Sequence, residues 1–139
     1  MIEFEEDVIV LVNEVRAAGA TCGGAAYGPT GSVSLNAALR CSARVHSQDM
    51  AIQGFFDHIN PDGEDPFDRM TLAGYDYSTA AENIAAGQLT PEAVMSGWMA
   101  SPGHCANIMN PAFSELGVGA YEAAASEFPI YWTQNFGSP

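Results

Sequence analysis

The sequence predicts an α+β domain in which helices pack on a small antiparallel sheet. Helix-type patterns fill most of the chain, and strand-type patterns follow only after Pro111. Chains with their helices and strands segregated in this way form α+β domains. The length of 139 residues suits one domain over residues 1–139, and no internal repeat or low-complexity linker divides it.

Two long helices are predicted from apolar residues at helical spacing. The apolar face of the first helix consists of Phe4, Val8, Leu11, Val12 and Val15. Acidic residues 5–7 fill its first turn, and Gly19 can cap its end. The second helix should begin at the N-cap Asn36 and end at Gly54, with an apolar face of Leu39, Ala43, His46 and Met50. Residues 20–33 between these helices are expected to form a loop.

Three shorter helices are predicted where a capping residue precedes proline. Asp65, Thr90 and Ser101 each stand directly before a proline, which is favoured at the first helical position. The first of these helices should extend to residue 74, the second to residue 99 and the third past residue 108. Residues 82–85 form a pattern too short to classify.

The strands are predicted near the end of the chain. Residues 116–121 and 130–136 are rich in β-branched, aromatic and glycine residues, and the acidic, alanine-rich segment 122–128 joins them. The expected order is therefore helices first and strands last.

The charge balance excludes several classes of partner. Acidic residues outnumber basic ones 17 to 4, and the formal net charge is −13. A chain this anionic is repelled by nucleic acid and by anionic lipid surfaces, so neither is an expected partner. No apolar run approaches the roughly 20 residues that span a bilayer. Metal cations and cationic partners remain open.

The cellular compartment stays open at this point. The first residues have neither the basic segment nor the apolar segment of a signal peptide, so the chain is cytosolic or is a mature segment with a start Met placed before it. Cys22, Cys41 and Cys105 allow one disulfide plus one free thiol, or three free thiols.

A few polar residues are candidates for chemistry. His58 and His104 lie near predicted element ends, where ligands and bases are often held. His46 lies on an apolar helix face, where a hydrogen-bonded core histidine is favoured over a ligand. Glu82 is a lone acid in an apolar stretch and, if buried, needs an arginine or histidine partner. Glu115 is a weaker candidate of the same type, and either glutamate can also be a solvated surface residue.

Common enzyme and calcium motifs are absent from the sequence. There is no GxSxG, HExxH or phosphate-binding loop, and the spacing of the acids in segment 60–65 does not match an EF-hand. His104 and Cys105 are neighbours on a predicted helix and therefore point in different directions, which disfavours a Cys-His nucleophile.

Taken together, the segments resemble a CAP-superfamily domain (the SCP/TAPS or PR-1-like family) in its compact bacterial form. The resemblance covers nearly the whole chain and is carried, in order, by residues 43–50, 55–58, 68–69, 73–75, 81–85, 98–99, 101–110, 113–119 and 131–136. It implies a three-layer α-β-α sandwich with a cleft lined by two histidines and acidic residues.

The resemblance assigns roles to individual residues. His58 matches the first cleft histidine, His104 the second, and Glu82 the glutamate of the GENxA-type motif, in which Ala81 stands where glycine is usual. Ser101 stands where many eukaryotic relatives have a second glutamate, and Glu115 is the nearest substitute. Some relatives bind a divalent metal through the two histidines, so weak binding of Zn²⁺ or another divalent cation by His58 and His104 is expected.

The family's secreted character adds further expectations. It favours a mature extracellular segment without its signal peptide, and related bacterial chains imply a Cys22–Cys105 disulfide with Cys41 as a buried free thiol. The expected function is a binding or interaction module, and the expected state is a monomer with an extracellular ligand that the sequence does not identify. The alternatives are a metal-dependent, protease-like hydrolase using the same cleft and, third, a lipid- or sterol-binding protein.

Overall fold

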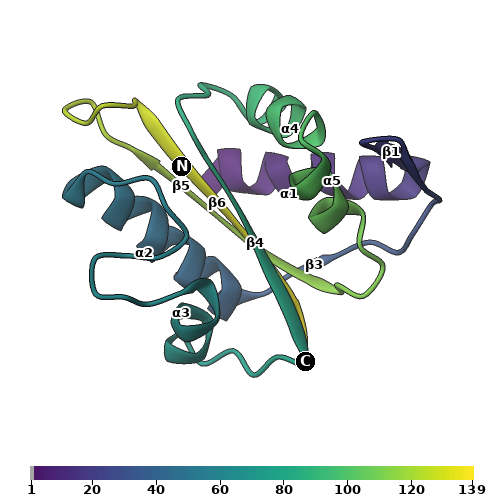
Figure 1. Cartoon of the computed structure of the whole chain (residues 1–139), viewed down its shortest axis with the longest axis horizontal. Helices are drawn as coiled ribbons and strands as arrows, with labels where there is room; N and C mark the ends of the chain where they lie inside the picture. Colours follow the sequence, from purple (N-terminus) through teal and green to yellow (C-terminus); the bar gives the residue numbers. More distant parts are fainter. Residues whose placement is uncertain (1) are drawn as a thin grey trace.

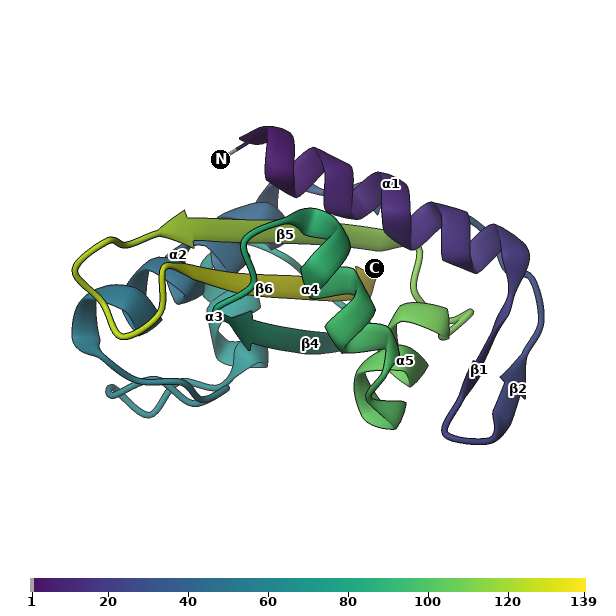
Figure 2. The same cartoon turned by 90° about the horizontal axis from the view of Figure 1, so that it is seen from above.

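The computed structural model describes residues 2–139 and places one sheet between two layers of helices (Figure 1). The sheet order is β3 (Ser34–Leu35), β5 (Glu115–Glu122), β6 (Ile130–Ser138) and β4 (Thr79–Ala86). One layer contains α1 (Ile2–Ala18), α4 (Pro91–Met99) and α5 (Pro102–Met109). The other contains α2 (Ala37–Gln53) and α3 (Pro66–Leu72), on the opposite face of the sheet (Figure 2). The α-β-α sandwich that the resemblance implies is confirmed.

The helices begin and end at the residues that local capping chemistry favours. The Asn36 side chain accepts hydrogen bonds from two backbone N–H groups of α2, and Asp65 forms a reciprocal capping box with Asp68 on α3. Gly54 ends α2 in the left-handed conformation at φ 73°, which glycine adopts without strain. Helix α3 ends at Leu72, slightly earlier than predicted. Among residues 2–139, no helix is both long and apolar enough to cross a membrane.

The sheet contains more strands than the sequence patterns predicted. The unclassified segment around Glu82 belongs to β4, which pairs antiparallel with β6 over all eight of its residues. Alanine and glutamate have low strand propensity, so this strand depends on pairing and on burial between the helix layers. The short β3 pairs parallel with β5. The expected loop 20–33 contains a hairpin of β1 (Ala20–Cys22) and β2 (Ala25–Tyr27).

Two glycines of β5 allow α2 to lie unusually close to the sheet. A Cβ atom at Gly117 would lie 2.1 Å from the backbone of Leu39 and Arg40, and one at Gly119 would lie 2.4 Å from the backbone of Ala43 and Arg44. No side chain fits there unless the helix moves. The glycines therefore set the distance of the whole α2–α3 layer from the sheet.

The disulfide expected from the resemblance is present. Cys22 at the end of β1 is bonded to Cys105 on α5, 83 residues further along the chain. The bond ties the hairpin to the first turns of α5, where Gly23 packs against Pro102. The expectation for the third cysteine is wrong: Cys41 is a free thiol but is exposed, because it lies on the face of α2 that points away from the sheet.

Buried Arg16 joins α1 to the end of α5. Its guanidinium donates hydrogen bonds to the carbonyl oxygens of Gly31, Ile108, Asn110 and Phe113 at 2.7–3.0 Å. No carboxylate of the described residues pairs with it, and burial lowers its pKa. The carbonyls at the C-terminal end of α5 carry partial negative charge, which stabilises the cation.

We predict that Gly119→Ala lowers the free energy of unfolding by about 1–3 kcal/mol, because the added methyl group displaces α2. Gly97→Ala on α4 is the matched control, since its added Cβ would lie no closer than 3.8 Å to a neighbour. The control should be neutral or should raise stability by up to about 1 kcal/mol through helix propensity. Urea denaturation measures both, and equal stability of the two variants would contradict the close-packing account.

Candidate functional site

The site is built around Glu82 on β4, at the edge of the sheet. Among the strands of residues 2–139, β4 pairs only with β6, so its other edge is free of strand partners. Successive side chains of a strand point to opposite faces. Glu82 contacts α3 in one helix layer, whereas Asn83 donates a hydrogen bond to the backbone oxygen of His104 on α5 in the other. Both layers therefore contribute residues to the same edge.

Arg69 neutralises the Glu82 carboxylate. The two side chains are 3% and 1% exposed, and Nη2 of Arg69 donates to both carboxylate oxygens at 3.0 and 2.9 Å. Nη1 of Arg69 donates to the backbone oxygens of His58 and Glu64. Arg69 therefore fixes both the charge at Glu82 and the backbone that carries His58.

His58 lies directly beside this ion pair. Its Nδ1 is 2.9 Å from Oε1 of Glu82 and must carry the proton, because a carboxylate only accepts hydrogen bonds. The hydrogen bond to Glu82 raises the pKa of His58, although partial burial opposes the shift. The side chain is 46% exposed, so the rest of the ring faces outward from the cluster.

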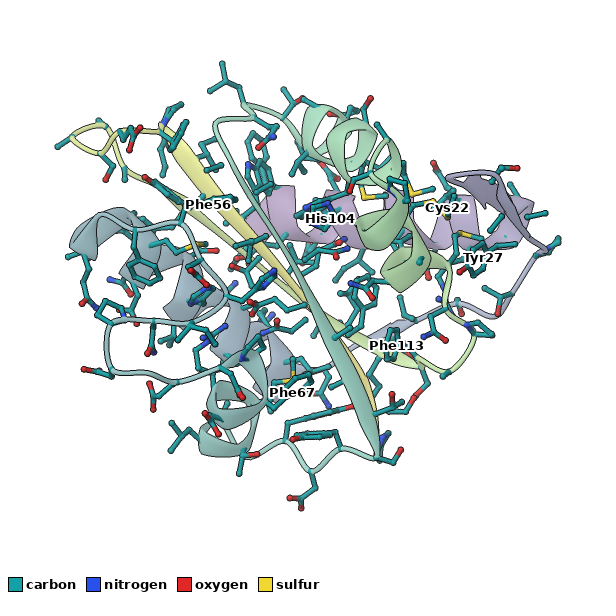
Figure 3. The ribbon with its side chains drawn as sticks, in the orientation of Figure 1. Cys22, Tyr27, Phe56, Phe67, His104 and Phe113 are labelled. Atoms are coloured by element: carbon teal, nitrogen blue, oxygen red, sulfur yellow. A yellow bond between two sulfur atoms is a disulfide. The ribbon has the colours of Figure 1, made fainter. Side chains whose placement is uncertain are left out.

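His104 comes from the opposite helix layer, in the first turn of α5. In Figure 3 it lies on one side of the β4 ribbon, and Phe56, two residues before His58, lies on the other. Burial lowers the pKa of His104, and the charge of nearby His58 lowers it further. The structure therefore brings His58, Glu82 and His104 to one edge of the sheet, with the two histidines favouring different protonation states.

His46 is a buried core histidine, as the sequence favoured. It is fully buried on α2, and its Nε2 lies 2.8 Å from the backbone oxygen of Asp57. Burial lowers its pKa. Its hydrogen bond holds the backbone one residue before His58 and so contributes to the position of that ring.

Two residues of the site, Arg69 and Asn135, were not singled out from the sequence. With its amide oriented to satisfy both neighbours, Asn135 donates to Oε2 of Glu82 at 2.8 Å and accepts from Oγ of Ser42 at 2.7 Å. A buried Glu82 requires a cationic partner such as Arg69. The sequence contains four arginines and does not show which of them lies beside Glu82. Asn135 belongs to a polar run in an otherwise aromatic strand, Thr133–Gln134–Asn135, and all three residues are fully buried. This run is the sequence feature that could have indicated a buried polar site.

Glu115 lies at the start of β5, separated from β4 by β6. Its carboxylate accepts hydrogen bonds from the hydroxyl of Tyr75 and the side-chain amide of Asn36, at 2.9 and 3.1 Å. None of these partners belongs to the cluster around Glu82. The structure thus places Glu115 in a different polar network, while Ser101 is the N-cap of α5.

The β4 edge offers few side chains that could bind a metal ion. Within residues 2–139, no three His, Cys, Asp or Glu side chains are grouped so as to hold a metal. The oxygens of Glu82 already accept hydrogen bonds from Arg69, His58 and Asn135, so this carboxylate can orient an imidazole rather than coordinate. The imidazoles of His58 and His104 are the available ligands.

We predict that His58 and His104 titrate on opposite sides of the ordinary pKa of 6.5. The raised pKa of His58 gives a stabilising contribution that is fully present below pH 6.5 and is lost as the pH rises through the folded-state pKa. The lowered pKa of His104 acts in the opposite sense and costs stability as the pH falls below 6.5. Histidine NMR spectra recorded against pH test this order, and a higher pKa for His104 than for His58 would contradict it.

Comparison with known sequences identifies relatives over most of the chain. The family model described as "Cysteine-rich secretory protein family" (CAP) matches residues 10–136. The chain is 46% identical over 104 residues to the uncharacterized protein YkwD of Bacillus subtilis, covering 75% of this chain and 38% of that protein. It is 33% identical over 91 residues to the uncharacterized membrane protein YlbC of the same species, covering 66% of this chain and 24% of that protein. The chain thus spans well under half the length of either relative.

Solved structures with the same fold support the family relationship found by sequence comparison. An extracellular protein containing a SCP domain from Bacillus anthracis superposes with a TM-score of 0.85 at 27% identity, over 99% of this chain and 41% of that one. An outer surface protein of Borrelia burgdorferi shares the fold, with a TM-score of 0.78 at 17% identity over 96% of this chain and 92% of that one. On this evidence the chain belongs to the CAP family of cysteine-rich secretory proteins.

Proposed function

We propose that this CAP domain is an extracellular binding module that accepts a divalent cation at the β4 edge through His58 and His104. The observation that carries the proposal is the hydrogen bond from Nδ1 of His58 to buried Glu82. A carboxylate held at Nδ1 fixes the tautomer of an imidazole and leaves its Nε2 lone pair for a metal. Metal-binding histidines commonly have a carboxylate in this position.

The net charge of the chain and the number of protein ligands determine the metal affinity that we expect. Zinc ligates well to neutral imidazoles, and two protein ligands leave further positions to water or to a ligand of a partner molecule. The net charge of −13 raises the local concentration of cations around the domain. Since only two protein ligands are available, the affinity should be low and the bound ion should stay accessible.

Binding is better supported than hydrolysis at this site. A hydrolytic role would need Glu82 as a general base for a metal-bound water. Its carboxylate oxygens instead accept hydrogen bonds from Arg69, His58 and Asn135, so they are already engaged by protein partners. We therefore assign Glu82 an orienting role.

An extracellular location agrees with the disulfide and with the relatives. Disulfides persist in oxidising compartments and are rare in the cytosol, and Cys22–Cys105 is a disulfide here. The Bacillus anthracis structure with a SCP domain is described as extracellular.

We predict that zinc shifts the NMR ring signals of His58 and His104 more than those of His46. His46 is the buried comparison, because it is bonded to a backbone oxygen and lies 3.8 Å from Glu82. His104→Ala should remove the response, and Glu82→Gln should weaken binding by about tenfold or more, because the carboxylate that orients His58 is lost. Absence of any ring response at millimolar zinc would contradict the proposal, as would equal affinity of the His104→Ala variant.

A further inference from the structure

Two consecutive residues of β4 contact the two histidine segments from opposite faces of the strand. Glu82 contacts the ring of His58 directly, through Nδ1. Asn83 points to the other helix layer, and its Nδ2 donates a hydrogen bond to the backbone oxygen of His104 at 3.2 Å. Adjacent positions of one strand are therefore bonded to both candidate metal ligands, once at the ring and once at the backbone.

Asn83 is fully buried, and both the nitrogen and the oxygen of its amide have partners. Nδ2 also donates to Oε1 of Gln134 at 3.1 Å, and Oδ1 accepts from Nδ2 of Asn107 at 2.9 Å. The carbonyl oxygen of His104 only accepts hydrogen bonds, so it must face Nδ2, and the orientation of the amide follows from this contact. Gln134 on β6 holds the amide in place from within the sheet.

The two contacts of Asn83 with α5 lie on one face of that helix. His104 and Asn107 are three residues apart, and residues at this spacing are neighbours on a helix surface. A single contact would let α5 turn about it, whereas two contacts on one face fix both the distance and the rotation of the helix. The rotation sets the direction in which the ring of His104 leaves the backbone. Asn83 therefore acts on this ring through the backbone that carries it.

We propose that Asn83 is a positioning residue for metal binding, because it sets the place of the His104 imidazole. Glu82, the preceding residue, does the same for His58. The inference rests on the proposed function, since a metal bound by both rings requires their relative positions to be fixed. The disulfide at Cys105 ties α5 to β1 and not to β4, so it does not replace this link to the strand.

The test removes the Asn83 side chain and follows both rings by NMR. In metal-free Asn83→Ala, ¹³C relaxation should show a more mobile ring at His104. The ring of His58 should be unchanged, because it keeps its hydrogen bond to Glu82. The zinc dissociation constant, measured from the ring signals, should rise about tenfold, at the lower end of the range for residues that orient metal ligands.

The two readouts separate this inference from the proposed function. A wild-type protein that does not bind zinc would reject the proposed function, and the metal-free ring mobility would still show whether Asn83 holds His104. A wild-type protein that binds zinc, together with an Asn83→Ala variant that binds it equally well, would overturn this inference alone. Unchanged mobility of the His104 ring in folded Asn83→Ala would overturn it as well.

Asn13→Ala is the matched control. The amide of Asn13 forms two hydrogen bonds with the backbone of Val33, at 3.0 and 2.8 Å, and joins α1 to the segment before β3. This variant also loses the hydrogen bonds of one asparagine amide, but at a site away from both histidines. It should keep wild-type ring mobility and zinc affinity. An equal loss of zinc affinity in Asn13→Ala would mean general destabilisation and would overturn the proposal.

Asn107→Ala decides the question if Asn83→Ala does not fold. Asn107 is half-buried, and its loss removes one of the two contacts on α5 while the hydrogen bond from Asn83 to His104 stays. The ring of His104 should again become more mobile, to a smaller extent than in Asn83→Ala. Wild-type mobility of that ring in Asn107→Ala would overturn the two-contact account.

Discussion

The carboxylate of Glu82 is held inside the protein, and its negative charge is neutralised by Arg69. Burying either charge alone would cost several kcal/mol, so each of these residues requires the other. The pair also connects parts that are distant in sequence: Arg69 brings α3 and the His58 backbone to β4, and Asn135 adds a contact from β6. His58 then takes its orientation from a carboxylate that is already fixed.

The ion pair bridges two layers, because Arg69 lies on α3 and Glu82 on β4, and it needs the α2–α3 layer to lie close to the sheet. The bare backbone at Gly117 and Gly119 admits α2, which carries Ser42 to Asn135 of β6 and His46 to the backbone oxygen of Asp57. On the other face, the Cys22–Cys105 disulfide and Arg16 hold the two ends of α5, which carries His104. His58 is therefore positioned by contacts within the α2–α3 layer, whereas His104 is positioned by the contacts that hold α5. Both layers reach the free edge of β4.

Local sequence chemistry was sufficient to predict where α2, α3 and α4 begin, because Asn36, Asp65 and Thr90 cap them with their own side chains. It was insufficient for β4, whose alanine-rich residues become a strand only through pairing with β6. The convergence of His58, Glu82 and His104 came from the family resemblance, since no local spacing links them. Arg69 and Asn135 could not be predicted as partners of Glu82, because a contact across α3, β4 and β6 is set by the tertiary fold. The burial of Cys41 that the resemblance implied was wrong, because a position within a helix does not by itself show which face of that helix meets the sheet.

A double-mutant cycle on Arg69 and Glu82 tests the central claim most directly. The variants are Arg69→Met, Glu82→Gln and the combination of the two, and the free energy of unfolding is measured by urea denaturation at constant pH. Each single change leaves one buried charge uncompensated and should cost about 3–5 kcal/mol. The double change should cost less than the sum of the single changes by at least about 1 kcal/mol, because both charges are then removed. Strictly additive costs would contradict the account, since they would mean that the two side chains do not depend on each other.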